Sequence, residues 1–504
     1  MRERKTVFFL TLGALVFRLL HVWIFSNELV VGGDQMQNIM LSRQFARGEI
    51  YGFLHPYWTP LYPFLLGVVA YFTDSLILPS LIVSILAGSL AVPLTYYLVM
   101  QFYGRREALV ASAIAIFYPH LLNSVFTLGT ENIYLLLVGC ALIAGWKALR
   151  NDSAFDYWLT GILVGLAYLT RPEGIGYTAF FALVIAGGRL WRKNFTARGA
   201  LSRIGIFLLG FAVLAVPYLL YLRAETGDWT VSGKTDLNFA AGIYFEGGEA
   251  ELGWHGSFLY VVVDNIIEFH RCFPNLFPIF LLILAALGLF RSRWRKERWA
   301  REAYLLLFCL VTVAVYVASV VQIRYFYVML PVLFGWTARG LIEAREWLSE
   351  SLHEWLPDKF YSPVSFRSFA SVSLILIYLY VLPLNFFMLS REKAWQNNGY
   401  EERDAGLWLK KNSGKPSPLV FSPSLRPVFY AESRHMPPTT ENVEEILSRI
   451  RRARVDYVII SERSLKRNVF LKGFTEKLSE MPDFELIYEK NDHPGYGISI
   501  FRLK

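Results

Sequence analysis

The stretch LILPSLIVSILAGSLAVPLTYYLVM, residues 76–100, contains no charged side chain. An α-helix needs about 20 predominantly apolar residues to cross a hydrocarbon core about 30 Å thick. This stretch is long enough, and the polar turn Gly104-Arg105-Arg106 follows it. We therefore predict a transmembrane helix here, and much of the chain before residue 391 repeats the pattern of apolar blocks and polar turns.

The other apolar blocks extend this prediction to about eleven transmembrane helices. They cover residues 7–25, 108–123, 131–149, 157–170, 173–190, 203–222, 274–290, 303–321, 325–341 and 368–388. The shorter stretch at 60–72 suits an interfacial or re-entrant helix better than a span. The composition agrees, since 54% of the residues are hydrophobic and only 18% are charged. The three cysteines fit no metal or redox spacing, so they predict neither a zinc site nor a disulfide framework.

Lysine and arginine concentrate in alternate loops, and such loops are cytoplasmic in most membrane proteins. The rich set lies at 2–5, 105–106, 147–150, 189–203, 291–301 and 339–367. The poor set contains only Arg43, Arg47, Arg171, Arg223, Lys234, Arg271 and Arg324. This asymmetry predicts a cytoplasmic N-terminus and extracytoplasmic loops at 26–75 and 223–273. It also explains the net charge of +9 without a nucleic-acid partner.

Residues 391–504 have a different character from the preceding membrane domain, residues 1–390. Short strand-like runs at 419–422, 456–461, 484–489 and 497–503 alternate with helical patterns at 401–411 and 441–453. We predict a small soluble α/β domain here, on the extracytoplasmic side. The fold class is thus a polytopic α-helical membrane protein with a C-terminal α/β domain.

Asp34 follows the glycine pair Gly32-Gly33 just beyond the first predicted span. Glycines let a backbone approach a ligand closely, and the carboxylate could take a proton from an acceptor hydroxyl or amine. The alternative is structural, because a helical pattern follows and an aspartate is a common N-cap.

Arg171-Pro172-Glu173-Gly174 separates two apolar blocks with almost no loop. Charges at a membrane boundary are costly unless they are paired or used. Arg171 could bind a phosphate oxygen and Glu173 could orient it. Alternatively, the two side chains form a turn in which they pair with each other or extend to the interface.

Four other polar residues have ordinary structural explanations when each is taken alone. Glu131 after Thr130 fits the first turn of a helix, and Arg324-Tyr325 fits an interfacial anchor. His55 and Arg271 lie in outer loops and could bind hydroxyls or phosphate. The predicted topology, however, puts all of these residues on the same membrane face as Asp34, Arg171 and Glu173. A polar cluster there suits a substrate that is part lipid and part water-soluble.

Short motifs in a fixed order give the chain a family resemblance. They are Gly33-Asp34, Thr59-Pro60-Leu61-Tyr62-Pro63, Tyr103-Gly104-Arg105-Arg106, Thr130-Glu131, Thr170-Arg171-Pro172-Glu173-Gly174, Arg324-Tyr325 with Pro331, and Val455-Asp456-Tyr457-Val458-Ile459. This order resembles the GT-C superfamily of polyprenyl-phosphate-dependent glycosyltransferases. The likeness is closest to the branch of protein O-mannosyltransferases, the lipid A aminoarabinose transferase and the core galacturonosyltransferases.

The resemblance implies roles for the candidate residues. Asp34 would be the catalytic acidic residue that activates the acceptor for an inverting, in-line displacement. Arg171 and Arg324 would bind the donor phosphate, while Glu131 and Glu173 would position sugar or acceptor. From their place in outer loops alone, we predict that Arg271 also binds the phosphate and that His55 also positions sugar or acceptor. Gln35 stands where many members have a second acidic residue. Its presence argues against a tightly held divalent metal, although relatives with paired acidic motifs use one.

The resemblance therefore implies a transferase in the plasma membrane of a prokaryote. The partners would be membrane lipids, a polyprenyl-phosphate-linked sugar and a lipid, glycan or protein acceptor; no cofactor is required. Two other functions remain open. A secondary transporter would place its charged sites near the membrane midplane, and a non-catalytic scaffold subunit would use the C-terminal domain for binding.

Overall fold

The structure is a computed structural model of the 504-residue chain. It describes residues 2–25, 29–190, 196–233, 258–290, 296–355, 399–491 and 496–504. The chain divides into two compact units: residues 1–27, 38–242 and 254–388 form the first, and residues 28–37, 243–253 and 389–504 form the second. The segment 28–37, which contains Asp34, belongs to the second unit.

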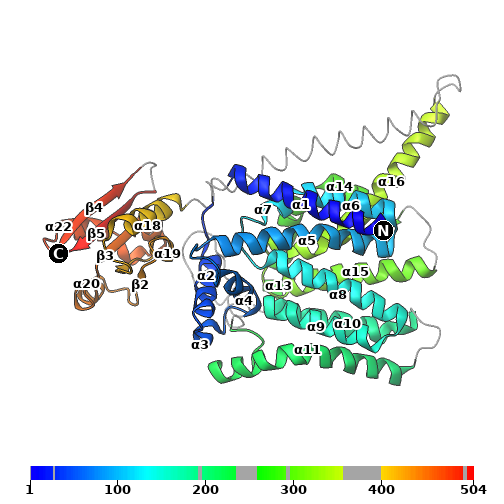
Figure 1. Cartoon of the computed structure of the whole chain (residues 1–504), viewed down its shortest axis with the longest axis horizontal. Coiled ribbons are helices and arrows are strands. Elements are labelled where there is room, and N and C mark those ends of the chain that lie inside the picture. The colour runs from blue at the N-terminus through cyan, green and yellow to red at the C-terminus, as the bar shows by residue number, and fades with distance from the viewer. Residues whose placement is uncertain are drawn as a thin grey trace. The chain divides into compact units, whose positions relative to one another are not determined.

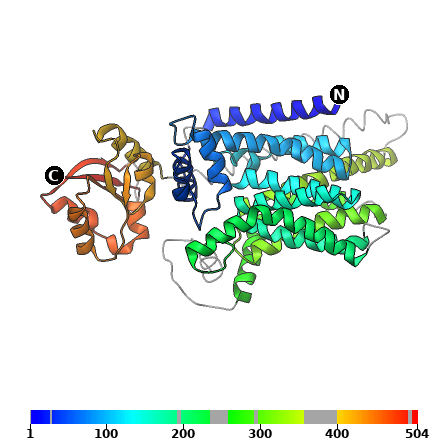
Figure 2. The same ribbon diagram turned by 60° about the horizontal axis from the view of Figure 1, so that its bottom comes forward.

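Among the described residues of the first unit, the regular elements are all helices (Figure 1). Its helices are α1 (Arg2–Phe25), α3 (Ile50–Phe53), α4 (Leu61–Ala70), α5 (Leu78–Phe102), α6 (Arg105–Phe117), α7 (Pro119–Asn123), α8 (Glu131–Asn151), α9 (Ala154–Thr170), η2 (Pro172–Ile175), α10 (Gly176–Ala186), η3 (Gly187–Leu190), α11 (Ala197–Thr226), α13 (Phe258–Leu276), α14 (Ile279–Phe290), α15 (Lys296–Val317), η4 (Ile323–Met329) and α16 (Leu330–Trp355). α2 (Gly33–Ala46) begins in the second unit and continues in the first. Figures 1 and 2 show α5, α8, α9 and α11 lying side by side.

Six helices of the described chain are long and apolar enough to cross a membrane. A seventh span results if α13 and α14, which are bent by 92° at their junction, count as one. The predicted number of about eleven is therefore not confirmed. The apolar helices α4, α9 and 172–186 are shorter, and the predicted block 108–123 divides into α6 and α7 at Pro119. Proline cannot donate the backbone hydrogen bond that a continuous helix requires. The predicted span at 368–388 lies outside the described residues.

Glycines allow some of these helices to pack with their backbones in contact. A Cβ atom on Gly340 of α16 would lie 1.8 Å from the carbonyl oxygen of Leu284 in α14. Across the same interface, a Cβ atom on Gly288 would lie 2.1 Å from the carbonyl oxygen of Trp336. Small residues at helix interfaces are typical of membrane bundles, where close packing replaces the hydrophobic effect between helices.

The second unit contains a five-stranded sheet with helices on both faces. Its elements are α18 (Tyr400–Asn412), β1 (Leu419–Phe421), α19 (Leu425–Tyr430), β2 (Arg434–Met436), α20 (Val443–Arg452), β3 (Tyr457–Ser461), α21 (Glu462–Arg467), η6 (Val469–Leu471), α22 (Phe474–Glu480), β4 (Phe484–Lys490) and β5 (Ile498–Leu503). The strand order is β2-β1-β3-β5-β4, parallel from β2 to β3 and antiparallel from β3 to β4.

Alternation along β3 explains the two cores of this unit. Val458 and Ile460 pack with residues of α20 and α22, whereas Tyr457 and Ile459 pack with residues of α18 and α19. Successive side chains of a strand point to opposite faces, so a central strand covered on both sides is apolar throughout. The strand-like runs in the sequence coincide closely with β1, β3, β4 and β5. The short edge strand β2 was not predicted.

Candidate functional site

A buried ionic cluster joins three segments of the first unit. Arg171 Nη1 lies 3.6 Å from Glu131 Oε1, and Arg324 Nε lies 3.5 Å from the same oxygen. Arg171 Nη2 also lies 3.4 Å from Glu173 Oε1. The structure thus brings together four of the seven predicted site residues, although they come from the start of α8, the junction of α9 with η2, and η4.

The backbone around Arg171 explains how this arginine reaches the cluster. α9 ends at Thr170, and Arg171 is extended (φ −149°, ψ 132°) before Pro172. A residue that precedes proline disfavours the α conformation, so the helix ends here. The chain then turns so sharply that a Cβ atom on Gly174 would lie 2.6 Å from the backbone nitrogen of Tyr168. Only glycine fits this turn without a shift of the backbone.

Glu131 is the centre of the cluster. The residue is only 4% exposed, and its Oε1 atom faces both guanidinium groups. Its Oε2 atom has no hydrogen-bond partner among the described residues. Oε2 lies over Gly129, where a Cβ atom would be only 2.1 Å away. Thr130, the residue before α8, makes no side-chain capping bond. Its Oγ1 atom instead accepts a hydrogen bond from Arg171 Nη1 at 3.4 Å.

Tyrosine rings enclose Arg171, and the sequence did not single them out as site residues. The guanidinium carbon lies 4.1 Å from the ring centre of Tyr325 and 5.7 Å from that of Tyr134. Tyr316 stacks on Tyr325 with 5.1 Å between ring centres. Guanidinium groups bind favourably over aromatic faces, above all where water is excluded. The tyrosines therefore hold Arg171 in one orientation.

Arg324 is the more accessible of the two arginines. Its side chain is 27% exposed, compared with 11% for Arg171. Arg324 Nε donates a hydrogen bond to Gln322 Oε1 at 2.8 Å, and its guanidinium carbon lies 5.5 Å from the Tyr325 ring centre. Both guanidinium groups therefore lie within 6 Å of the same tyrosine ring. An anion that approaches this cluster would meet Arg324 first.

Tyr62 is a further buried polar residue that the sequence suggested only as part of a motif. Its hydroxyl donates to the carbonyl oxygen of Leu128 at 2.7 Å, just before the turn that holds Glu131. Leu128 has a positive φ of 46°, which is uncommon for a residue with a branched apolar side chain. This hydrogen bond therefore supports the strained turn behind Glu131.

His55 and Arg271 make their contacts elsewhere. His55 Nδ1 accepts a hydrogen bond from the backbone nitrogen of Tyr57 at 3.0 Å, and burial lowers the pKa of His55 below its usual value. Its imidazole is therefore neutral at pH 7. Arg271 lies on α13 with a largely exposed side chain, 3.8 Å from Glu268 of the same helix. Their proposed roles in binding stay predictions.

Asp34 lies in the second unit, in the first turn of α2. The helix begins at Gly33, so Asp34 is inside the first turn rather than at the capping position before it. A carboxylate is favoured there by the helix dipole. Asp34 is exposed, while the neighbouring Gln35 is buried with its side chain folded towards Gly32. This exposure leaves Asp34 accessible to a substrate.

Part of the chain matches a known protein family. Residues 55–221, about a third of the chain, match the family model described as dolichyl-phosphate-mannose-protein mannosyltransferase. This segment includes Glu131, Arg171 and Glu173. No curated protein sequence matches the chain.

Several solved structures are similar to nearly the whole chain. ArnT from Cupriavidus metallidurans, bound to undecaprenyl phosphate, has a TM-score of 0.61 at 12% identity, over 99% of this chain and 98% of that one. The oligosaccharyltransferase AglB from Archaeoglobus fulgidus, in complex with an inhibitory peptide and a dolichol-phosphate, has a TM-score of 0.59 at 14% identity, over 98% and 74%. The arabinofuranosyltransferase AftD from Mycobacteria has a TM-score of 0.50 at 13% identity, over 98% and 41%.

Proposed function

Because the chain has the fold of the GT-C superfamily of glycosyltransferases, we propose that it transfers a sugar from a polyprenyl-phosphate carrier to an acceptor. The observation that carries this proposal is the ionic cluster of Glu131, Arg171 and Arg324. It places two guanidinium groups near helix ends in a fold whose solved examples include complexes with undecaprenyl phosphate and a dolichol-phosphate. The predicted topology puts the reaction on the extracytoplasmic face.

The chemistry follows from the charges. The acceptor oxygen or nitrogen attacks the anomeric carbon and loses its proton to the carboxylate of Asp34. The bond between that carbon and the phosphate oxygen breaks, and the electron pair leaves with polyprenyl phosphate. Negative charge grows on the phosphate, where preorganised arginines stabilise the transition state more than the ground state. The configuration at the anomeric carbon is inverted.

The geometry favours a role for Glu131 that differs from the one predicted. Its Oε1 atom already contacts both arginines, so we assign it to orienting the two cations rather than to contacting sugar. A carboxylate between two guanidinium groups limits their mutual repulsion and fixes their positions. The acceptor, whether lipid, glycan or protein, is left open by this assignment.

The release of polyprenyl phosphate tests the proposal. Purified protein in liposomes would be supplied with a mixed pool of polyprenyl-phosphate sugars and a membrane extract as acceptor source. We expect wild-type protein to release polyprenyl phosphate and Asp34→Asn to release none while still binding donor. Asp228→Asn is a matched control, since Asp228 lies in a predicted outer loop with a 93% exposed side chain. Equal turnover by Asp34→Asn and wild type would remove Asp34 from the catalytic role.

A further inference from the structure

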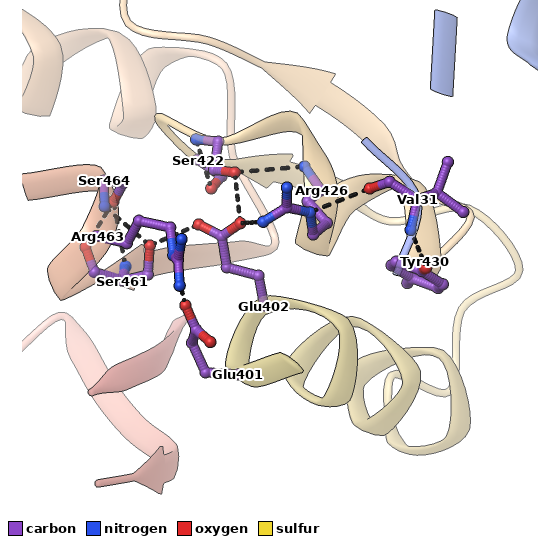
Figure 3. A network of polar contacts seen from close by, with 10 residues as sticks. Val31, Glu401, Glu402, Ser422, Arg426, Tyr430, Ser461, Arg463 and Ser464 are labelled. Carbon is purple, nitrogen blue, oxygen red and sulfur yellow. Dashed lines mark hydrogen bonds and ion pairs between the residues drawn. The ribbon is translucent and has the colours of Figure 1, made fainter. Parts of the chain in front are cut away.

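Side chains of the second unit hold the backbone just before Asp34 (Figure 3). The backbone nitrogen of Val31 donates to Tyr430 Oη at 2.9 Å, and the carbonyl oxygen of Val31 accepts from Arg426 Nε at 3.2 Å. Both backbone groups of Val31 are thus bonded to side chains of α19. Arg403 of α18 adds a hydrogen bond to the carbonyl oxygen of Leu29 at 3.4 Å. Val31 is only 1% exposed.

A buried carboxylate fixes the orientation of Arg426. Arg426 Nη1 lies 3.0 Å from Glu402 Oε2, and the Glu402 side chain is 2% exposed. The hydroxyls of Ser424 and Ser461 donate to the same carboxylate at 3.0 and 2.7 Å. Figure 3 shows Glu402 pointing from α18 towards Arg426, whose other side faces Val31. Every hydrogen bond of this network therefore favours one position of the guanidinium group.

A buried ionic network of this kind contributes little net free energy to the stability of a fold. Removing two charges from water costs free energy that their mutual attraction offsets only partly, so a buried ion pair is weak evidence for stability. A fully satisfied polar network does, however, specify a single geometry. Here the geometry that it specifies is the position of a backbone segment almost 400 residues earlier in the chain.

The segment after Val31 explains why this position matters. Gly32 and Gly33 lie between Val31 and Asp34, and glycine has more backbone freedom than any other residue. Gly33 is the first residue of α2, so Gly32 alone separates Val31 from the helix. Hydrogen bonds at Val31 therefore fix the chain one residue before the helix that carries Asp34. Misplacement of a reacting group by about 1 Å can cost about 100-fold in rate.

We propose that Arg426 and Tyr430 are positioning residues. Through them the C-terminal part of the second unit (the C-terminal unit, residues 399–504) holds the residue 29–31 backbone and so orients Asp34 towards the acceptor. This inference rests on the proposed function and assigns the C-terminal unit a part in it. The unit acts on the reaction through the backbone hydrogen bonds of Val31, and it need not touch the substrate.

Tyr430→Phe tests the proposal with the least disturbance, because it removes only the hydroxyl that accepts from Val31. We expect kcat for polyprenyl phosphate release to fall about tenfold or more with an unchanged KM for the donor. Tyr457→Phe is the matched control: the Tyr457 hydroxyl also bonds a backbone group of the same unit, the carbonyl oxygen of Ser413 at 3.0 Å. That variant should retain wild-type kcat. Equal kcat values for all three proteins would overturn the proposal.

A labelling experiment separates this inference from the proposed function, because it requires no turnover. Val31→Cys would react slowly with a membrane-impermeant maleimide in the full-length protein, and faster when Tyr430→Phe is added. Labelling that is equally slow in both proteins would show that Tyr430 does not hold the segment. Faster labelling with unchanged kcat would also overturn the positioning role. If wild-type protein released no polyprenyl phosphate, the proposed function and the positioning role that rests on it would fail. Labelling that Tyr430→Phe accelerates would still show that Tyr430 holds the residue 29–31 backbone.

Discussion

At the scale of single residues, the cluster of Glu131, Arg171 and Arg324 was partly predictable. The distribution of basic residues placed these three and Glu173 on one membrane face, and the structure brings all four into a chain of ion pairs. The two explanations offered for Arg171 and Glu173 are compatible, since the residues pair with each other while Arg171 also contacts Glu131. The contacts of Tyr134 and Tyr325 with Arg171 were not predicted, because a tyrosine near a helix end usually marks a membrane interface.

Arg324→Gln should weaken donor binding. If Arg324 makes one charged hydrogen bond to the phosphate, its loss costs about 1.5–3 kcal/mol, or about 10- to 150-fold in Kd. Arg324 suits this test better than Arg171, because Glu131 keeps its contact with Arg171 when Arg324 is removed, whereas Arg171 pairs with both Glu131 and Glu173. Binding of a fluorescent polyprenyl phosphate would measure the effect.

Arg223→Gln provides the comparison for that experiment. Arg223 also lies near the predicted outer end of a span, but it pairs with the exposed Asp228 and lies over Trp229. Its variant should bind the lipid as wild type does. If both variants bound equally well, Arg324 would be an interfacial anchor and not a donor ligand.

His435 predicts a pH dependence of the C-terminal unit. Burial lowers its pKa below the usual value near 6.5, and its Nε2 atom bonds the carbonyl oxygen of Ser422. The unfolded state then binds protons more readily than the folded state, so stability falls as the pH drops below about 6.5. Hydrogen exchange at residues 434–436 of the full-length protein, corrected for intrinsic rates, should be less protected at pH 5 than at pH 7. His435→Gln should remove most of this difference, and an unchanged pH dependence would contradict it.

At the scale of elements, apolar length predicted where helices lie better than how many cross the membrane. α5 covers almost the same residues as the predicted block 76–100, and the short stretch at 60–72 forms the short helix α4. The sequence predicted the turn at Pro172 but not the break at Pro119. The lengths of the helices around both prolines depend on packing. Close contacts such as that between Gly288 and Trp336 depend on which helices become neighbours, which no local pattern reveals.

Gly340→Ala should destabilise the first unit. Its Cβ atom would lie 1.8 Å from the Leu284 carbonyl oxygen, and a backbone atom cannot move away by changing rotamer. Overpacking of this kind costs about 1–3 kcal/mol, measurable as a lower midpoint of thermal unfolding in detergent. Gly205→Ala in α11 is the control, because its Cβ atom would meet nothing within 4 Å. Equal midpoints for the two variants would contradict the close packing of α14 and α16.

At the scale of the whole molecule, the fold is similar to those of ArnT and AglB, in agreement with the family resemblance of the sequence motifs. The sequence did not predict that residues 28–37 belong to the second unit. Val31 and Arg426 are far apart in the chain, and hydrogen bonds to backbone atoms leave no pattern in the side chains of the held segment.

The account depends on a lipid phosphate binding at the cluster of Glu131, Arg171 and Arg324. A cryo-EM structure of the protein with undecaprenyl phosphate would test this most directly. We predict density for the phosphate within hydrogen-bonding distance of Arg324 or Arg171, with the chain of the lipid between apolar helices. A phosphate bound elsewhere, with both arginines still paired to Glu131 and no density beside them, would contradict the account.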